Sequence, residues 1–520
     1  MTDYTPPQRQ VPQAAGRGKA GSDDIGEEQL SVGEIKSRAA AGSVLLAVRS
    51  ALINLFGFSS TLVLAHLLVR SDFGLVAIGF MVIGVGGFLA DSGIAMGLVR
   101  RAAAPTRQEL RSITGFQLLV SVSIATFATL ASLVIGGSSF VTALMAFSMP
   151  ILALRTPGLV YLDRQLDYRI RVRVELGETA AYFVWVCSTA AVGWGAWSIA
   201  SAVVVKAIVG VALVMRMTPL GVIWPSFRLA PIRPLLRFGL RFQGLSAVQV
   251  LHDTTLSAGI GAIGGLGVLG LWSLCGRVLL VPSLLFNNLW NISIPAYARL
   301  LHAGEDLGAL VERSVVVLAI AGGFVLAVLA GCGGALMPVV FGAKWNDVAL
   351  ILPGACLALA VSAPINISMM AAVYAAGDSR TPLMGSMVHG IFRLPLSLIG
   401  LHFFGVGAIG VGWLIGQLVE IPFVLPRIHA HVGRPVGRKL PVPVALTTLS
   451  GALGMALVSI GGTGVAGLVL SAAGTAAAFL LMTRIADPVG LAITRQAAAS
   501  VVRHSLQRMR SPAATASSAA

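Results

Sequence analysis

Charged residues are scarce in this chain. Only 11% of its 520 residues are Asp, Glu, Lys or Arg, whereas a soluble domain contains about 25%. The four cysteines lie singly in apolar stretches, without the spacing of a metal site or a redox pair, and the sequence contains no G-x-x-x-x-G-K-S/T phosphate loop. The composition therefore excludes a soluble domain, and we expect no metal, no cofactor and no ATP hydrolysis by the chain itself.

Long apolar runs occupy most of the sequence between residues 43 and 486. A membrane-spanning helix needs roughly 20 apolar residues, and fourteen runs are long enough. We therefore predict an all-α membrane protein with about 14 transmembrane helices. The predicted spans are 43–69, 73–99, 112–135, 140–161, 175–193, 196–217, 238–262, 266–296, 313–337, 348–375, 382–403, 405–426, 440–461 and 464–486.

The basic residues occupy alternate gaps between these runs. If the amino terminus lies in the cytoplasm, 30 of the 37 Lys and Arg residues fall in predicted cytoplasmic segments, and only Arg70 and Lys344 fall on the opposite face. This asymmetry follows the positive-inside rule, so it predicts an even number of spans with both termini in the cytoplasm. It also accounts for the net charge of +16, and we expect no nucleic-acid partner.

A weak internal repeat relates the two parts of the chain. Arg70-Ser-Asp-Phe-Gly-Leu joins the first two spans, and Gly264-Gly-Leu-Gly-Val-Leu-Gly-Leu-Trp joins the seventh and eighth. Gly193-Trp-Gly-Ala-Trp-Ser and Gly405-Val-Gly-Ala-Ile-Gly open the sixth and twelfth spans. The repeat predicts two pseudo-symmetric six-helix halves around a central cavity, as in transporters built from parallel repeats. The expected segments are a disordered cytoplasmic tail (1–42), an N-terminal half (43–217), a cytoplasmic linker (218–237), a C-terminal half (238–426), an extra helix pair (440–486) and a basic cytoplasmic tail (487–520).

Several of these segments resemble a known family. Leu67-Leu-Val-Arg-Ser-Asp-Phe-Gly-Leu-Val-Ala, Leu89-Ala-Asp-Ser-Gly-Ile-Ala-Met-Gly-Leu-Val-Arg-Arg, Leu162-Asp-Arg-Gln-Leu-Asp-Tyr-Arg and Gly195-Ala-Trp-Ser are similar to Wzx-like polysaccharide transporters. These belong to the multidrug/oligosaccharidyl-lipid/polysaccharide (MOP) flippase superfamily. The resemblance implies a flippase, not an enzyme, in a bacterial inner membrane, which moves undecaprenyl-diphosphate sugar units across the bilayer. The partners it implies are that lipid-linked oligosaccharide, membrane lipid, and a glycan polymerase with export machinery.

Charges inside the predicted spans are candidate functional residues. A charge at a helix centre costs at least about 2.5–3.5 kcal/mol, so it usually faces a cavity or a partner. Arginine suits a diphosphate, because its guanidinium group donates two parallel hydrogen bonds. Arg49 could instead reach the headgroups or pair with Asp91, and Arg155 could pair with Glu175 or Glu178. The candidate substrate-binding arginines are Arg49, Arg155, Arg277 and Arg393.

Other polar side chains in the spans suit sugar or proton binding. Asparagine amides and a tryptophan face suit sugar hydroxyls and pyranose rings, although asparagines also join helices through hydrogen bonds. The candidate sugar contacts are Asn287, Asn288, Trp290 and Asn291. The candidate ion or proton residues are Asp91, Asp253 and His389. His252 precedes Asp253, and we interpret Glu420, near the cytoplasmic end of its span, as structural.

Three other functions stay open. A cation-coupled multidrug antiporter of the same superfamily has twelve helices as a rule, so the extra predicted pair favours the polysaccharide branch. A peptidoglycan-precursor (lipid II) flippase has fourteen, but the residues around Asp72-Phe-Gly resemble the polysaccharide branch better. A membrane polymerase or ligase should have a large external loop, and the longest predicted here, residues 338–347, is short.

Overall fold

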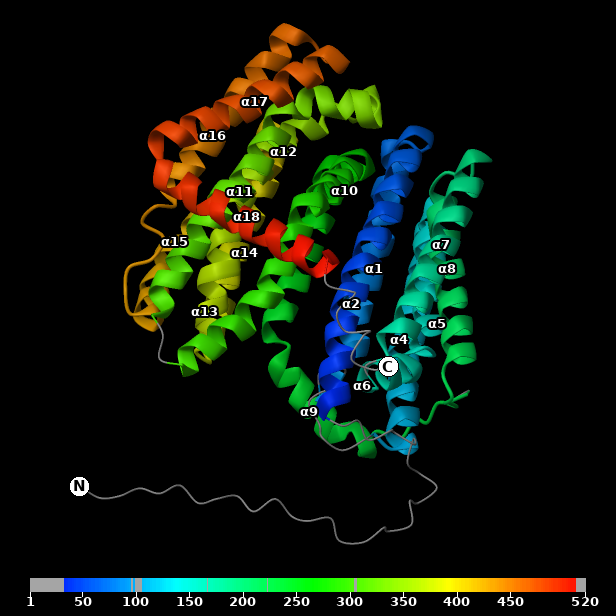
Figure 1. Ribbon diagram of the computed structural model, residues 1–520. Coiled ribbons are helices and arrows are strands. Elements are labelled where there is room, and N and C mark those ends of the chain that lie inside the picture. Colours follow the sequence, from blue (N-terminus) through cyan, green and yellow to red (C-terminus); the bar gives the residue numbers. More distant parts are fainter. Residues whose placement is uncertain are drawn as a thin grey trace, which may run out of the picture.

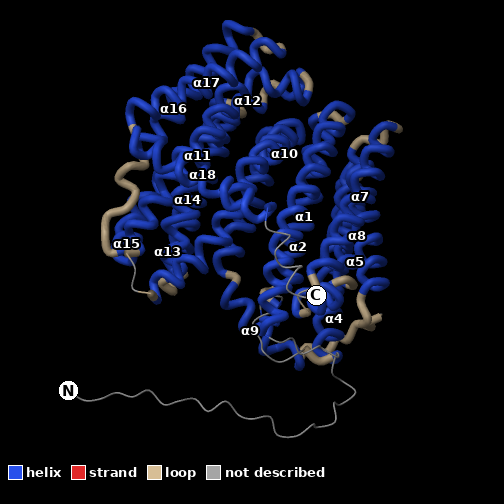
Figure 2. The backbone as a smooth tube through the Cα atoms, viewed as in Figure 1, coloured by secondary structure: helices blue, strands red, loops and turns tan. Residues whose placement is uncertain are grey.

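The computed structural model describes residues 32–94, 97–98, 105–165, 167–221, 223–303 and 306–510. These residues form helices and connecting loops, and no strand occurs among them (Figure 2). Most of the predicted amino-terminal tail, residues 1–31, lies outside the described residues, as does 511–520. The first helix begins at Val32, before the predicted residue 43. The predicted all-α fold class is confirmed.

Seventeen α-helices carry the architecture of the described part, joined by short 3₁₀ and π segments. They are α1 (Val32–Leu67), α2 (Arg70–Asp91), α4 (Arg107–Ile135), α5 (Phe140–Ala153), α6 (Thr156–Arg164), α7 (Tyr168–Ala191), α8 (Ala196–Met217), α9 (Arg233–Phe242), α10 (Gly244–His302), α11 (Leu307–Leu336), α12 (Val348–Pro364), α13 (Met370–Ala375), α14 (Arg380–Phe404), α15 (Gly407–Val432), α16 (Pro441–Gly461), α17 (Val465–Ala486) and α18 (Pro488–Arg510).

The number of membrane spans differs from the prediction. Eleven helices of the described part are long and apolar enough to cross a membrane, or twelve if α5 and α6, which meet at a bend of 49°, form one span. The predicted count of 14 is not confirmed. Two of the predicted spans fall in the single helix α10, and α7 is missing from the eleven because Glu175 and Glu178 interrupt its apolar run.

Helix α10 is too long for one crossing. Its apolar part, Gly244–Ser283, has 40 residues. At 1.5 Å per residue these extend about 60 Å, roughly twice the hydrocarbon thickness of a bilayer. The helix breaks at Gly265, whose φ of 75° lies in the region that favours glycine. The two arms of α10 thus correspond to the predicted spans 238–262 and 266–296.

The helices gather in two groups (Figure 1). Helices α1 to α8, blue to green in the figure, form the N-terminal half, and α10 to α15, green to orange, form the C-terminal half. Helix α10 lies between them and packs against α2 on one side and against α12, α13 and α14 on the other. Helices α16 and α17 pack against α11, so the extra pair is attached to the C-terminal half.

A reciprocal contact joins the two halves at the break in α10. A Cβ atom at Gly74 would lie 1.9 Å from the carbonyl oxygen of Leu266, and one at Gly270 would lie 2.0 Å from that of Arg70. Leu266 follows Arg70, and Gly270 follows Gly74, by the same 196 residues. Equivalent residues therefore meet in both directions, as they do across a two-fold axis. The contact supports the internal repeat read from the sequence.

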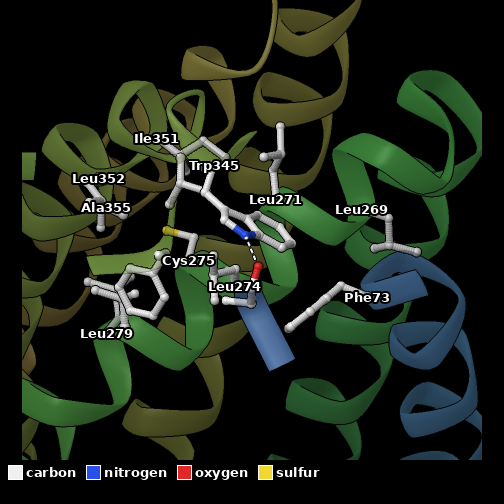
Figure 3. Packing of buried hydrophobic residues seen from close by; sticks show 14 of the residues in the cluster. Phe73, Leu269, Leu271, Leu274, Cys275, Leu279, Trp345, Ile351, Leu352 and Ala355 are labelled. Atoms are coloured by element: carbon white, nitrogen blue, oxygen red, sulfur yellow. Dashed lines mark hydrogen bonds between the residues drawn. The ribbon is translucent and has the colours of Figure 1, made fainter. Parts of the chain in front are cut away.

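The largest hydrophobic core lies where the halves meet (Figure 3). The Trp345 side chain, from the loop between α11 and α12, is fully buried there among Leu271, Ile351 and Phe73. The Phe73 and Trp345 rings meet edge to face, with centroids 4.9 Å apart. The indole Nε1 donates a hydrogen bond of 2.9 Å to the Ala65 carbonyl of α1. This loop of the C-terminal half is thus anchored in the N-terminal half.

Candidate functional site

Charged side chains form hydrogen bonds around the buried Trp345 on one face of the molecule. Arg70, at the start of α2, donates from Nη1 to the Asp347 carboxylate at 2.6 Å and from Nε to the Lys344 carbonyl. The Lys344 ammonium in turn donates to the carbonyls of His66, at 2.9 Å, and Leu68, at 2.6 Å. Charge-assisted hydrogen bonds of this kind are roughly twice as strong as neutral ones. We call Arg70, Lys344, Trp345 and Asp347 the Arg70 latch.

The sequence alone does not identify the Arg70 latch as a site. Arg70 and Lys344 are the two basic residues that depart from the charge asymmetry, and this exception was the available signal. Burial lowers the pKa of the Lys344 ammonium, although the Asp72 carboxylate opposes that change. The ammonium therefore lies in a partly desolvated junction between the halves. In this conformation the hydrogen bonds of the Arg70 latch hold the two halves together on one face of the molecule.

Arg277 lies where α10 meets the N-terminal half. Its Nη1 donates to the Thr61 hydroxyl of α1 at 3.4 Å. Its guanidinium carbon lies 5.7 Å from the ring centroid of Phe73 and 6.0 Å from that of Phe80, both on α2. Among the described residues, no carboxylate forms an ion pair with it. Arg277 is thus a cation at the junction of the halves, held by a hydroxyl and two aromatic rings.

Arg49 and Arg155 are both neutralised inside the N-terminal half. Arg49 forms an ion pair with Glu175 of α7. Arg155, between α5 and α6, pairs with Glu178 at 2.5 Å, and the Glu178 side chain is buried. Glu175 also accepts from Arg171 at 3.2 Å. Both arginines have the partners of a structural network, so neither is free to neutralise a substrate in this conformation.

Asp91 has a different partner from the one expected. Instead of pairing with Arg49, it accepts a hydrogen bond of 3.3 Å from the Gln243 amide, which directly precedes α10. It also accepts from the backbone nitrogen of Gly93 at 3.2 Å. Asp91 therefore ties the end of α2 to the start of α10.

Arg393 occupies the centre of a polar cluster within the C-terminal half. Its side chain is buried, and its guanidinium carbon lies 4.4 Å from the ring centroid of Trp413 and 5.7 Å from that of Trp272. Its Nη1 atom lies 3.8 Å from the Asp253 carboxylate of α10. Stacking on two indoles and pairing with a carboxylate both stabilise a cation in apolar surroundings.

Two imidazoles and a carboxyl group extend this cluster between α14 and α15. The rings of His252 and His389 meet edge to face at 5.5 Å, and His389 Nδ1 lies 3.8 Å from Glu420 Oε2. Glu420 is buried and accepts from the Gln417 amide at 2.7 Å. Glu420, which the sequence predicts to be structural, lies in the same cluster as the candidate residues His389 and Asp253. We call the six residues the Arg393 cluster: His252, Asp253, His389, Arg393, Gln417 and Glu420.

The predicted sugar contacts lie on the second arm of α10. The Trp290 ring meets the Tyr374 ring of α13 edge to face at 5.6 Å. The side chains of Asn287, Asn288 and Asn291 lie outside the part of the structure that is described. The four residues remain a prediction as sugar contacts.

A pocket of about 440 Å³ opens beside the start of α14 and the end of α15. Burial opposes ionisation of Asp378 there, but hydrogen bonds from Thr381 and Arg380 and the nearby His431 outweigh it and lower the pKa of this carboxyl. Asp378 Oδ1 accepts from the backbone nitrogen of Arg380 at 2.8 Å, which satisfies a free amide of the first turn of α14. The pocket is separate from Arg277 and from the Arg393 cluster. Its lining is Asp378, Arg380, Thr381, Met384, Arg427, Ala430 and His431.

A family model described as polysaccharide biosynthesis protein matches residues 63–350, which is more than half of the chain. The chain belongs to this family. It is also 22% identical over 405 residues to the lipopolysaccharide biosynthesis protein WzxC of Escherichia coli (strain K12), which covers 74% of this chain and 80% of that protein. The predicted resemblance to Wzx-like proteins is thus confirmed.

Solved structures of the MOP superfamily share the fold of this family member. A lipid II flippase MurJ in an inward closed conformation matches with a TM-score of 0.65 at 10% identity, over 85% of this chain and 98% of that one. An inward-facing multidrug resistance MATE family transporter matches with a TM-score of 0.56 at 13% identity, over 75% and 98%. The protein is therefore a multi-pass membrane protein with the architecture of transporters.

Proposed function

We propose that this protein flips a lipid-linked oligosaccharide, an undecaprenyl-diphosphate sugar, from the cytoplasmic to the outer leaflet during polysaccharide synthesis. It does so by alternating access between its two halves, with both termini in the cytoplasm. Membership of the polysaccharide biosynthesis family supports the substrate class, and the shared fold supports the transport mechanism. The Arg70 latch then faces the periplasm, so this conformation is closed to the outside. The product would pass to a glycan polymerase and export machinery.

Arg277 is the observation that carries the proposal. A diphosphate needs a cation that is not already neutralised, and Arg277 has no described carboxylate partner, whereas Arg49 and Arg155 have one each. Arg277 lies between α1, α2 and α10, where a substrate held between the halves would contact the N-terminal and the C-terminal half. Thr61 and the two phenylalanine rings hold its guanidinium in position. Arg393 is a second candidate for the same anion.

The test is complementation of a strain from which the gene has been deleted. The deletion should trap the diphosphate-linked sugar on the cytoplasmic leaflet, and the native protein should release it. Arg277→Ala should lower flipping about 10- to 150-fold, since hydrogen bonds to a charged group contribute about 1.5–3 kcal/mol. Arg277→Lys should restore part of the rate, because lysine keeps the charge but not the fork. Arg299→Ala, an exposed arginine on the same helix, is the matched control.

Two outcomes would contradict this function. If deletion leaves the surface polysaccharide unchanged but sensitises cells to cationic drugs, the protein is a multidrug antiporter. If deletion instead stops cell-wall synthesis and traps the peptidoglycan precursor, it is a lipid II flippase.

A further inference from the structure

We propose that His252, His389 and Glu420 form one proton-binding site inside the C-terminal half, and that its proton drives transport. The proposed proton-binding site does not depend on which substrate the protein moves. The coupling of its proton to transport rests on the proposed flippase function.

The three groups are buried together without complete hydrogen bonds. The three residues are buried, with His252, His389 and Glu420 at 7%, 9% and 5% exposure, and they come from α10, α14 and α15. Within the described part, His252 Nε2 and His389 Nδ1 are buried with no hydrogen-bond partner. His389 Nδ1 lies 3.8 Å from Glu420 Oε2, which is too long for a hydrogen bond. A buried polar atom without a partner costs free energy. A proton between the imidazole and the carboxylate would let them close this gap.

The charges of the cluster leave room for one proton. The described titratable groups that face one another are His252 and Asp253 from α10, His389 and Arg393 from α14, and Glu420 from α15. With both imidazoles neutral, the Arg393 cation stands against the carboxylates of Asp253 and Glu420. Arg393 and Glu420 are buried, whereas Asp253 lies at the exposed edge of the cluster, and apolar surroundings penalise an unbalanced charge. One added proton, on His389 or Glu420, makes the group neutral overall.

A proton fits this site better than a metal ion. Arg393 is a fixed positive charge in the cluster, and its Nε is also buried without a partner. A divalent metal ion beside it would be repelled more strongly than a single proton, which can neutralise the Glu420 carboxylate without adding a second positive group. No group of three or more His, Cys, Asp and Glu side chains among the described residues is placed to hold a metal ion. A proton needs a single lone pair, and His389 Nδ1 offers one.

Helix α10 connects this site to the junction of the halves. The Asp253 side chain is 73% exposed on α10, whereas the neighbouring His252 turns inward, toward Gly390 of α14. Asp253 therefore places one carboxylate of the cluster on the surface of α10. The same helix breaks at Gly265 and carries Arg277 on its second arm. A proton that changes the packing of α10 on α14 would thus act on the helix that contacts both halves.

Proton binding can be followed through Trp413, which lies beside Arg393. The purified protein is titrated by tryptophan fluorescence between pH 5 and 9, and Trp413→Phe defines the signal of this residue. We expect one titration step that fits a single proton. His389→Asn and Glu420→Gln, which keep the side-chain shape, should each reduce its amplitude at least tenfold. His402→Asn, an exposed histidine on the same helix, should leave it unchanged.

Two variants keep the titration decisive. His252→Asn provides a further test if one of the other variants fails to fold, as judged by size-exclusion chromatography. If the step persists in a folded His389→Asn, Glu420→Gln double variant, these groups do not bind the proton and the proposal is overturned. If the native protein shows no step, it is overturned as well.

Coupling is tested in proteoliposomes that contain the lipid-linked oligosaccharide. An imposed pH gradient should raise the flipping rate of the native protein at least tenfold, and Glu420→Gln should flip at one rate with or without the gradient. If the native protein flips at the same rate with and without the gradient, the proposed coupling is overturned. Absence of flipping by the native protein would overturn the proposed function instead, while the fluorescence step would still report the proton site.

Discussion

The reciprocal glycine contact makes a sharp prediction about the closed conformation. In Gly74→Ala, the new methyl group would lie 1.9 Å from the Leu266 carbonyl oxygen, whereas ordinary contacts begin at about 3.4 Å. The obstacle is backbone, so α2 and α10 must separate by about 1.5 Å. Overpacking of this kind costs about 1–3 kcal/mol, which corresponds to a 5- to 150-fold shift toward the state with the halves apart.

Labelling of a buried cysteine measures this shift. Ala65, whose carbonyl accepts from Trp345, is fully buried in the closed state. In a background without the four native cysteines, Ala65→Cys should react with a small polar maleimide in proportion to the open population. Adding Gly74→Ala should raise the labelling rate about 5- to 150-fold. Gly267→Ala is the matched control, since a methyl group there has nothing within 4 Å.

The same reasoning constrains the partner substitution. Gly270→Ala should act like Gly74→Ala, because its methyl group would lie 2.0 Å from the Arg70 carbonyl oxygen. The double variant should add little to either single change, since the helices are then already apart. If Gly74→Ala labels no faster than the Gly267→Ala control, the reciprocal contact does not hold the halves together.

Three further predictions follow from other contacts. Arg155→Ala should lower the free energy of unfolding in detergent by about 3–5 kcal/mol, because it leaves Glu178 buried without its partner. Adding Glu178→Gln should recover part of this loss, and an equal loss in the single and the double variant would contradict the pairing. Gly454→Ala, on α16, should lower the melting temperature, because its methyl group would lie 2.0 Å from the Thr475 hydroxyl of α17 and 2.7 Å from the Cα atom of Gly331 of α11. Gly464→Ala, with open space, should not. Asp378→Ala should cost about 1 kcal/mol at neutral pH, because it removes the carboxylate that accepts from the first amides of α14. Since the folded pKa of this carboxyl is lowered, the difference should shrink as the pH falls through that pKa, and a constant difference would contradict the assignment.

The helical membrane fold could be predicted because the length of an apolar run is a local property of the sequence. The structure contains helices over the predicted apolar runs, but the count of 14 spans is not confirmed, because α10 covers two runs, α5 and α6 divide another, and α7 is less apolar than the rest. Gly264 and Gly265 were placed at a junction between spans, and the break in α10 falls at Gly265. Glycine at such a point needs no tertiary information, because the backbone conformation alone requires it.

The partners of the buried charges could not be predicted, because spacing along a helix does not say which helix it faces. Arg155 had two equivalent candidates, Glu175 and Glu178, which lie one turn apart on the same face of α7. The structure assigns Glu178 to Arg155 and Glu175 to Arg49. That distinction depends on where α1 and the bend between α5 and α6 lie against α7, which is a property of the packing.

The Arg393 cluster shows the same limit at a candidate site. The sequence placed His389 one turn from Arg393 on a single helix, and this part follows from helical geometry. It did not place Asp253 against the guanidinium group or Glu420 against the imidazole, because these come from α10 and α15. Groups far apart in sequence form the cluster, so only the tertiary structure identifies its members.

The two carboxylates of α7 also bear on how the protein is made. A segment with Glu175 and Glu178 is a poor candidate for insertion on its own, since each carboxylate adds a penalty of about 2.5–3.5 kcal/mol at membrane depth. Their partners, Arg49 and Arg155, lie earlier in the chain and are translated first. Helix α7 would therefore enter the bilayer against helices that are already present, as one step of assembly. A change at either arginine would then reduce the yield of inserted protein before it affected any mature molecule.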